Sequence, residues 1–203
     1  MSFAERPSRR LLLAQALAGS ALGFGAGYSP FAFAQGTIAP ATPTCHDGDA
    51  PTKPDIEGPY FKLHSPLRTQ LAESNTRGQL YRLEGFVLTR TCKPVPSAIL
   101  DLWHADERGA YDEEGFRYRG HLFTDKTGRY RFDTIMPGLY PGRTRHYHFK
   151  VAAPFGRVLT TQLYFPNEPR NATDDYYSPK LLMRIAKGSP ATTARFDFIL
   201  DVI

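Results

Sequence analysis

RYRFDTIMPGLYPGRTRHYHFKVA, residues 129–152, contains two segments in which polar and apolar side chains alternate, separated by a loop rich in proline and glycine. Alternate residues of a β-strand face opposite sides, so this period of two predicts half-buried strands over Arg129–Ile135 and His146–Ala152. In the second strand, three apolar residues would face the core. His146 and His148 would then project together from the other face.

The same alternation, bounded by Gly, Pro, Asn or Asp, recurs along the chain. It predicts at least six strands, of which the others lie over Leu80–Thr89, Ala98–Ala105, Val158–Phe165 and Arg195–Val202. Only Pro179–Lys187 favours a short helix. Short strands at this spacing are typical of an antiparallel β-sandwich, so we expect an all-β domain with little helix.

The first 34 residues have the pattern of an export signal. Arg9 and Arg10 precede an apolar run over residues 11–18, and Ala32-Phe-Ala34 has the small-x-small form of a cleavage site. Paired arginines favour the twin-arginine route, although an ordinary secretory signal with two coincidental arginines is the alternative. The apolar run is short and is followed by several glycines, which disfavours a membrane anchor. The mature chain would begin near Gln35 and lie in the periplasm or outside the cell.

Length and charge indicate a single catalytic or binding domain. Removing 34 residues from 203 would leave 169, enough for one domain with a core. We expect an extended arm over residues 35–55 and one sandwich domain over residues 56–203. The formal charge of +5 would fall to +3, because the leader carries three Arg and one Glu. Neither this charge nor any Lys/Arg run indicates nucleic-acid binding, and no segment of the mature chain is apolar enough to span a bilayer.

Cys45 and Cys92 are the two cysteines of the chain. In an oxidising compartment they predict one disulfide, which would tie the arm to the first strands. Two unrelated free thiols are the alternative. The spacing does not match a C-x-x-C metal or redox pair.

Candidate metal ligands gather around the second quoted strand. His146 and His148 on one strand face are a reasonable ligand pair, but the H-x-H spacing alone describes two solvated histidines equally well. Tyr140 precedes them in a loop held by two Pro-Gly pairs, and such turns can aim its phenol at a defined point. Tyr111 ends the loop that follows the strand starting at Ala98.

The donors available near this strand indicate which metal it would suit. No Asp or Glu lies within five residues after His148, so the carboxylate that completes an iron(II) facial site is missing. Phenolates are anionic oxygen donors that stabilise iron(III) over iron(II). The sequence therefore predicts a ferric Lewis-acid site with the ligands Tyr111, Tyr140, His146 and His148.

An ordered series of motifs runs through the chain: Glu57-Gly-Pro-Tyr60, Leu102-Trp-His-Ala-Asp106, Thr124-Asp-x-x-Gly-x-Tyr-x-Phe132, Ile135-x-Pro-Gly-x-Tyr-Pro141, Arg143-x-x-His-x-His148 and Thr161-Gln-Leu-Tyr-Phe165. Each motif is weak alone, but the series resembles the intradiol ring-cleavage dioxygenases, the family of protocatechuate and catechol dioxygenases. The resemblance implies a β-sandwich enzyme of aromatic catabolism. Such an enzyme uses non-heme Fe(III) and O₂ to cleave a catechol between its two hydroxyl-bearing carbons, giving a cis,cis-muconate-type product.

The resemblance also implies roles for individual residues. Tyr140 and His146 would be the axial ligands of the iron, with the other two ligands equatorial, and Tyr140 would also act as a base. Arg143 corresponds to a guanidinium that stabilises the carbanion-like substrate, and Gln162 to a glutamine near it.

Other residues could shape the site. Tyr60 and Trp103 are candidates for contact with the substrate, although a lone tryptophan in a strand is usually part of the core. His104 and Asp106 are interpreted as a hydrogen-bonding pair that shapes the loop after them. The remaining histidines are interpreted as surface or structural residues: His46, His64 and His121.

Two departures from the family pattern leave the substrate and the assembly open. Residues 35–55 could not form the long helical segment through which catechol-type relatives dimerise, and the interval from Tyr140 to His146 is shorter than in protocatechuate enzymes. The preferred catechol and a homo-oligomeric state therefore stay undecided. A hypothesis of another class is a non-catalytic secreted β-sandwich, a carbohydrate-binding or transthyretin-like module, which would bind no iron and be colourless.

Overall fold

The computed structural model describes residues 45–202. The signal peptide predicted over residues 1–34 and the predicted arm up to residue 44 lie outside these described residues. Residues 45–58 contain neither helix nor strand, as expected of an arm. Between residues 45 and 202, no helix is long and apolar enough to cross a membrane.

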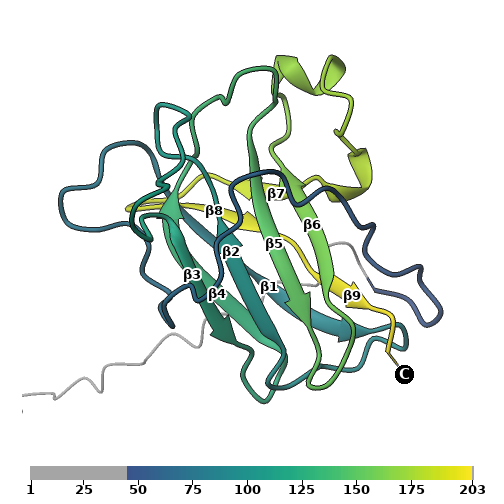
Figure 1. Cartoon of the computed structure of the whole chain (residues 1–203). Helices are drawn as coiled ribbons and strands as arrows, with labels where there is room; N and C mark the ends of the chain where they lie inside the picture. Colours follow the sequence, from purple (N-terminus) through teal and green to yellow (C-terminus); the bar gives the residue numbers. More distant parts are fainter. Residues whose placement is uncertain (1–44, 203) are drawn as a thin grey trace, which may run out of the picture. The chain divides into compact units, whose positions relative to one another are not determined.

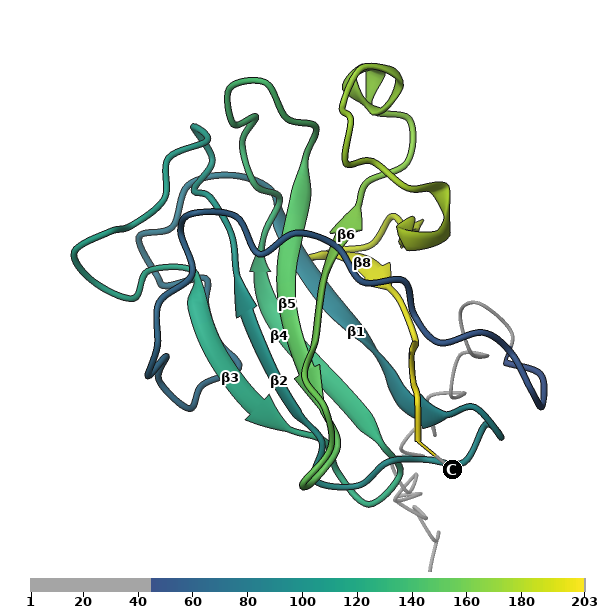
Figure 2. The same ribbon diagram turned by 45° about the vertical axis from the view of Figure 1, so that its right-hand side comes forward.

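Two sheets packed face to face form the described part of the chain (Figures 1 and 2). The strands are β1 (Leu80–Thr89), β2 (Ile99–Trp103), β3 (Arg119–Phe123), β4 (Arg129–Ile135), β5 (His146–Ala152), β6 (Leu159–Tyr164), β7 (Arg184–Ala186), β8 (Thr192–Arg195) and β9 (Phe198–Leu200). One sheet has the order β4-β1-β8-β7, with β9 also paired to β1, and the other has the order β3-β2-β5-β6. The predicted all-β sandwich is therefore confirmed.

The strand pairing is mostly antiparallel, but two parallel pairings of β1 were not predicted. β1 pairs in parallel with both β8 and β9. The helix predicted over Pro179–Lys187 is wrong: only a single 3-10 turn, η2 (Pro179–Leu181), forms there, and β7 follows it. Another 3-10 turn, η1 (Pro169–Ala172), precedes it. The helix does not continue beyond η2, because Leu182 bridges to Tyr164 and residues 184–186 pair with β8.

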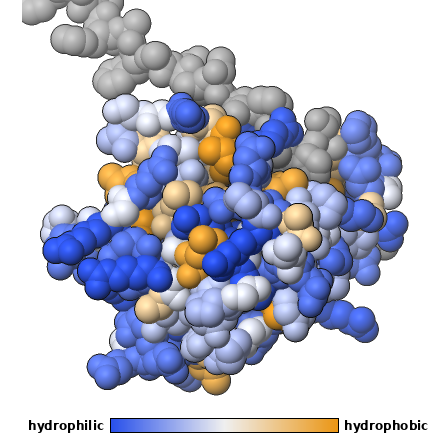
Figure 3. All heavy atoms as spheres, turned by 90° about the horizontal axis from the view of Figure 1, so that it is seen from above, coloured by the Kyte–Doolittle hydropathy of each residue, from blue (hydrophilic) through white to orange (hydrophobic). Residues whose placement is uncertain are grey.

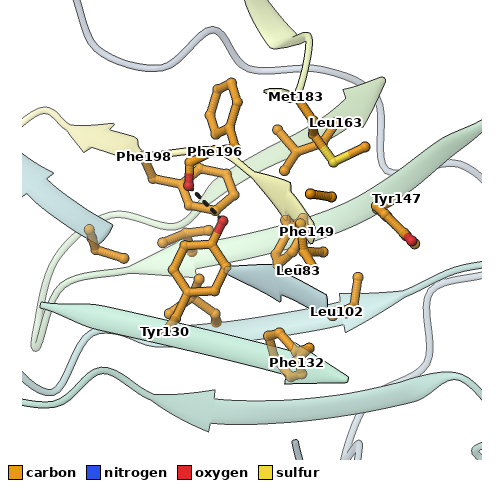
Figure 4. Packing of buried hydrophobic residues seen from close by; sticks show 14 of the residues in the cluster. Leu83, Leu102, Tyr130, Phe132, Tyr147, Phe149, Leu163, Met183, Phe196 and Phe198 are labelled. Atoms are coloured by element: carbon orange, nitrogen blue, oxygen red, sulfur yellow. Dashed lines mark hydrogen bonds between the residues drawn. The ribbon is translucent and has the colours of Figure 1, made fainter. Parts of the chain in front are cut away.

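The core lies between the two sheets and is rich in aromatic side chains (Figure 4). Alternate residues of β4 and β5 point into it, among them Phe132 and Phe149, which are fully buried. Tyr130 is buried as well, and its hydroxyl donates a hydrogen bond of 2.8 Å to the carbonyl oxygen of Phe196. The inward face of β5 is therefore used by the core, which leaves its other face for His146 and His148.

The strand predicted over Arg195–Val202 is wrong as a single element, because it is interrupted between β8 and β9. Asp197 was expected on a polar face, but only 1% of its surface is exposed. Its Oδ1 accepts a hydrogen bond of 2.9 Å from the backbone N–H of Phe86 in β1. The carboxylate thus replaces the carbonyl that a continuous strand would offer, and the pairing with β1 resumes beyond it in the same register.

The arm crosses the outer face of the second sheet near β5 and β6, as the dark-blue segment of Figure 1 shows. The backbone N–H of Asp55 donates to the carbonyl oxygen of Thr160 at 2.9 Å. The side chain of Gln162 donates to the carbonyl oxygen of Ile56 at 2.8 Å. The arm therefore bonds to β6 at Thr160 and Gln162 and lies beside the outward-facing residues of β5.

A disulfide joins the start of the described arm to the turn after β1. Its partners are Cys45 and Cys92, whose Cα atoms are 5.7 Å apart. The backbone N–H of Gly48 also donates to the carbonyl oxygen of Arg90 at 2.9 Å, so the arm is held at this end by covalent and hydrogen bonds.

The loop before β5 lies at the upper end of the sandwich in Figure 1. Figure 3 shows this end from above, with a mostly hydrophilic surface over which apolar side chains are scattered. The candidate site described next lies beneath this end.

Candidate metal centre

Two buried imidazoles on the outer face of β5 converge on one point. The Nε2 atoms of His146 and His148 are 3.0 Å apart, and the two residues are 4% and 2% exposed. His146 Nδ1 donates to the carbonyl oxygen of Thr144 at 2.7 Å, which leaves the lone pair of its Nε2 directed at the common point. The strand alternation that predicted this pair is therefore matched by the geometry, and neither histidine is solvated.

Burial keeps both imidazoles neutral. It lowers the pKa of His146 to about 4, with the nearby Arg143 charge acting in the same direction. Burial also lowers the pKa of His148 well below its usual value, and the neighbouring His146 adds to this effect. Neutral imidazoles with free lone pairs are the form that binds metal ions.

The surroundings of His148 leave room for the imidazole and for little else. Its ring stacks on the indole of Trp103, with ring centres 4.9 Å apart and planes 9° from parallel. On the arm side, a Cβ at Gly58 would lie 3.3 Å from His148 Cε1, and Gly58 has a φ of +72° that favours glycine. Trp103, a candidate for substrate contact, thus supports a histidine from a position that is 1% exposed.

Tyr111 brings a phenol oxygen to the same point. Its Oη lies 3.0 Å from Nε2 of His148 and 3.3 Å from Nε2 of His146. Its ring stacks on that of Tyr60, with centres 4.3 Å apart and planes 11° from parallel. Burial raises the pKa of the Tyr111 phenol, while the positive charges of Arg143 and Arg119 act in the opposite direction.

Tyr140 lies beside this group through Tyr60. The hydroxyls of Tyr60 and Tyr140 are 3.1 Å apart, and this hydrogen bond is the largest cause of the raised pKa of Tyr60. The ring of Tyr140 meets that of Tyr111 edge-on, with centres 5.9 Å apart. The structure therefore places Tyr111, His146 and His148 in direct contact and Tyr140 in the adjoining position.

Two glycines allow the loops that carry the tyrosines to touch. A Cβ at Gly109 would lie 2.2 Å from the carbonyl oxygen of Leu139, and a Cβ at Gly138 would lie 2.3 Å from the backbone nitrogen of Gly109. The backbone N–H of Gly138 also donates to the carbonyl oxygen of Asp106 at 2.6 Å. The positions of the two phenols are thus coupled through backbone contacts.

The donor set fits a ferric ion. Within residues 45–202, no three His, Cys, Asp or Glu side chains come close enough to hold a metal ion, so an ion at this point would take phenol oxygens among its ligands. Nε2 of His146 carries a free lone pair because Nδ1 bears the ring proton, and it lies 3.0 Å from Nε2 of His148 and 3.3 Å from the Tyr111 oxygen. A cation would satisfy all three atoms, and imidazole together with phenolate suits iron(III).

Arg143 is held beside this group by two partners. Its Nη2 donates to Oε1 of Gln162 at 2.8 Å, so these two predicted residues are in contact. Its Nε donates to Asp174, whose side chain is only 1% exposed, at 2.8 Å. Asp174 also accepts hydrogen bonds from the backbone N–H groups of Thr144 and Tyr176. A buried carboxylate that was not predicted therefore fixes the guanidinium.

The predicted pair of His104 and Asp106 is wrong. Both nitrogens of the His104 ring have other partners: Nδ1 lies 2.7 Å from the carbonyl oxygen of Ala105, and Nε2 lies 2.7 Å from the hydroxyl of Thr134. Asp106 does shape the loop, because its Oδ1 accepts the backbone N–H of Ala110 at 2.9 Å. His104 packs in the interior instead.

The other histidines lie outside the site. His46 and His64 are exposed. His121 is partly buried, and its Nδ1 lies 2.8 Å from the carbonyl oxygen of Ser65.

Residues 56–202 match the family model described as "Dioxygenase". Catechol 1,2-dioxygenase of Acinetobacter baylyi is 28% identical over 154 residues, which are 62% of this chain and 50% of that protein. The protocatechuate 3,4-dioxygenase beta chain of Burkholderia cepacia is 32% identical over 132 residues, 56% of either chain. This chain thus spans about half the length of the curated relatives it matches.

Solved structures show the same sandwich. The dioxygenase domain of a dioxygenase and carbohydrate-binding protein fusion from Streptomyces sp. SirexAA-E is 52% identical, with a TM-score of 0.74 over 76% of this chain and 100% of that chain. The 3-chlorocatechol 1,2-dioxygenase of Rhodococcus opacus is 27% identical, with a TM-score of 0.69 over 74% of this chain and 72% of that chain.

Proposed function

Because the chain belongs to the intradiol ring-cleavage dioxygenases, we propose that it cleaves a catechol-type aromatic compound between its two hydroxyl-bearing carbons. The co-substrate would be O₂, and the product would be a cis,cis-muconate-type acid. The observation that carries the proposal is the convergence of the Tyr111 hydroxyl and the two histidine Nε2 atoms within 3.3 Å of each other.

The cofactor in this proposal is non-heme Fe(III), held by four residues: Tyr111, Tyr140, His146 and His148. When bound, the ferric ion would supply Lewis acidity toward the two oxygens of the catechol. The neutral state of the imidazoles and the contact between the phenol and both Nε2 atoms support this ligand set.

Tyr140 would serve as the base that accepts a catechol proton. Its hydroxyl already shares a hydrogen bond of 3.1 Å with that of Tyr60. The same partner could hold the Tyr140 phenol after it takes the proton, so the proton would remain at a defined oxygen. A base must be within hydrogen-bond reach of its proton, and this loop brings the phenol to the edge of the site.

Arg143 would stabilise negative charge that develops on the ring. Gln162 and Asp174 hold the guanidinium from two sides, so its charge is already in place before the substrate arrives. Tyr60 would contribute to the wall of the substrate site through its stack on Tyr111. Trp103 would contribute indirectly, by supporting His148 from behind.

The choice of catechol, the assembly state and the location of the protein are further proposals. The relatives act on catechol, protocatechuate, hydroxyquinol and chlorocatechol, according to their names. We propose export through the twin-arginine route to the periplasm or beyond, on the sequence pattern of residues 1–34 alone. Fractionation of cells with intact and Lys-substituted Arg9 and Arg10 would test it.

The test of the function is purification with iron, a visible spectrum, and oxygen uptake over a panel of catechols with product identification. Iron bound by tyrosinate would make the protein red-brown, and muconate-type products would establish intradiol cleavage. Tyr111→Phe should lose the part of the visible band that its own tyrosinate contributes and keep the part from Tyr140, whereas Tyr130→Phe, which removes a buried phenol from the core, should keep the whole band. A colourless iron-loaded protein or yellow semialdehyde products would refute the proposal.

A further inference from the structure

Two segments without helix or strand carry the two stacked rings, one that of Tyr60 and the other that of Tyr111. Tyr60 lies in residues 58–62, which follow the arm, and Tyr111 lies in residues 110–117 of the loop between β2 and β3. Their rings are 4.3 Å apart and nearly parallel. No strand pairing joins these segments within the described chain, so their relative position depends on side-chain contacts.

Arg119 of β3 bonds to both segments from below. Only 2% of this residue is exposed. Its Nη1 donates to the carbonyl oxygen of Tyr60 at 2.6 Å. Its Nε and Nη2 donate to the carbonyl oxygen of Asp112 at 3.2 and 3.1 Å. One planar guanidinium therefore bonds to the backbone carbonyl of Tyr60 and to that of Asp112, the residue after Tyr111.

Lys62 makes a second connection nearer the surface. It lies in the segment 58–62, and its Nζ donates to the carbonyl oxygens of Glu113 and Gly115 at 2.9 and 2.7 Å. The same ammonium lies 4.9 Å from the centre of the Phe116 ring. The two cations together satisfy four backbone carbonyls that lie outside the strands.

We propose that Arg119 and Lys62 form a clasp that positions Tyr111 for metal binding by fixing the stack of Tyr60 on Tyr111. Both are positioning residues, since they act through backbone carbonyls and not on the substrate. The geometry of Arg119 is specific to a guanidinium, because a lysine ammonium on its flexible stem cannot reproduce the planar fork that reaches Tyr60 and Asp112 at once. The inference rests on the proposed role of Tyr111 as a ligand.

The experiment compares Arg119→Lys and Lys62→Met with Tyr130→Phe as the control. Tyr130→Phe removes one buried hydrogen bond in the core, away from both segments. Hydrogen exchange of segments 58–62 and 110–117 is measured in the metal-free proteins. Iron affinity and the position of the tyrosinate-to-iron absorption band are measured after loading, and kcat and KM are measured separately.

In the clasp mechanism, both variants exchange faster in the two segments, whereas Tyr130→Phe does not. Arg119→Lys binds iron about 10- to 100-fold more weakly, the range found when groups supporting metal ligands are removed, and its absorption band shifts. Lys62→Met shows the same changes to a smaller degree. Its side chain is only partly buried, so this variant still tests the clasp if Arg119→Lys does not fold.

Two results would refute the clasp, and the second of them would also refute the proposed function. If the unmodified protein shows the band and both variants match its band, iron affinity and exchange, the clasp is refuted and the proposed function stands. If the unmodified protein binds no iron, the proposed function fails, and the role of the clasp in metal binding fails with it.

Discussion

The contact between Gly109 and the Tyr140 loop allows the effect of a single methyl group to be worked out. In Gly109→Ala the new Cβ would lie 2.2 Å from the carbonyl oxygen of Leu139, where contacts below 3.0 Å essentially never occur. The loops must therefore separate by at least 0.8 Å, the difference between these distances. The left-handed backbone at φ +89° costs an alanine about 1–2 kcal/mol, and overpacking about 1–3 kcal/mol more. We expect the free energy of unfolding to fall by about 2–5 kcal/mol.

The same displacement should appear in the activity. A misplacement of about 1 Å can lower the rate on the order of 100-fold, so kcat/KM for a catechol should fall by about that factor in an oxygen-uptake assay below the melting temperature. Gly48→Ala is the matched control, because Gly48 has a φ of +85° and nothing within 4 Å of the added Cβ. It should lose about 1–2 kcal/mol of stability and keep its activity. Equal losses in the two variants would show that loop spacing does not position the phenols.

Three further predictions concern the buried charges and the disulfide. Asp174→Asn should leave the Arg143 guanidinium, whose side chain is 12% exposed, without its buried carboxylate partner. We expect the free energy of unfolding in denaturant to fall by about 3 kcal/mol, the lower end of the range for a broken buried pair, and kcat to fall more than KM changes. Burial lowers the pKa of His104 to about 4, so the unfolded chain takes up a proton that the folded protein excludes. The stability from neutral His104 should be complete above about pH 6.5 and decline as the pH falls toward 4, and His104→Gln should flatten that decline in urea titrations at several pH values. Replacing both Cys45 and Cys92 by Ser should lower the free energy of unfolding by about 2–4 kcal/mol, because the disulfide closes a loop with a sequence separation of 47. Thermal unfolding measures this loss, and an unchanged melting temperature would contradict it.

The strands that could be predicted are those whose alternation reflects burial on one side only. Arg129–Ile135 and His146–Ala152 have the predicted bounds because the residues of one face are buried throughout and are apolar or aromatic except for Thr134. Arg195–Val202 alternates just as cleanly, but the charge of Asp197 is used to bond the neighbouring strand. Sequence alone cannot distinguish a carboxylate that faces water from one that substitutes for a backbone carbonyl.

In the candidate site too, some residues could be predicted from local sequence patterns and others could not. The H-x-H pair and the loop of Tyr140 could be predicted because strand alternation and Pro-Gly turns are local. Asp174 lies 31 positions from Arg143 with no pattern to connect them, and Arg119 belongs to a strand that the alternation did not predict. Residues that support a site from a distance follow from tertiary contacts, and neither Asp174 nor Arg119 is distinguished from the charged and polar residues next to it in the sequence.

The arm bonds to β6 and leads directly to Gly58, whose backbone packs against His148. Detachment of the arm would therefore disturb both the edge of the sheet and the metal centre. It would leave the carbonyl oxygen of Thr160 on β6 without the backbone N–H of Asp55, and exposed strand edges template pairing with other molecules. Molecules whose metal centre is disturbed in this way would then tend to aggregate and be lost from solution. The population that stays in solution would be enriched in competent enzyme, so loss of activity and loss of soluble protein should proceed together.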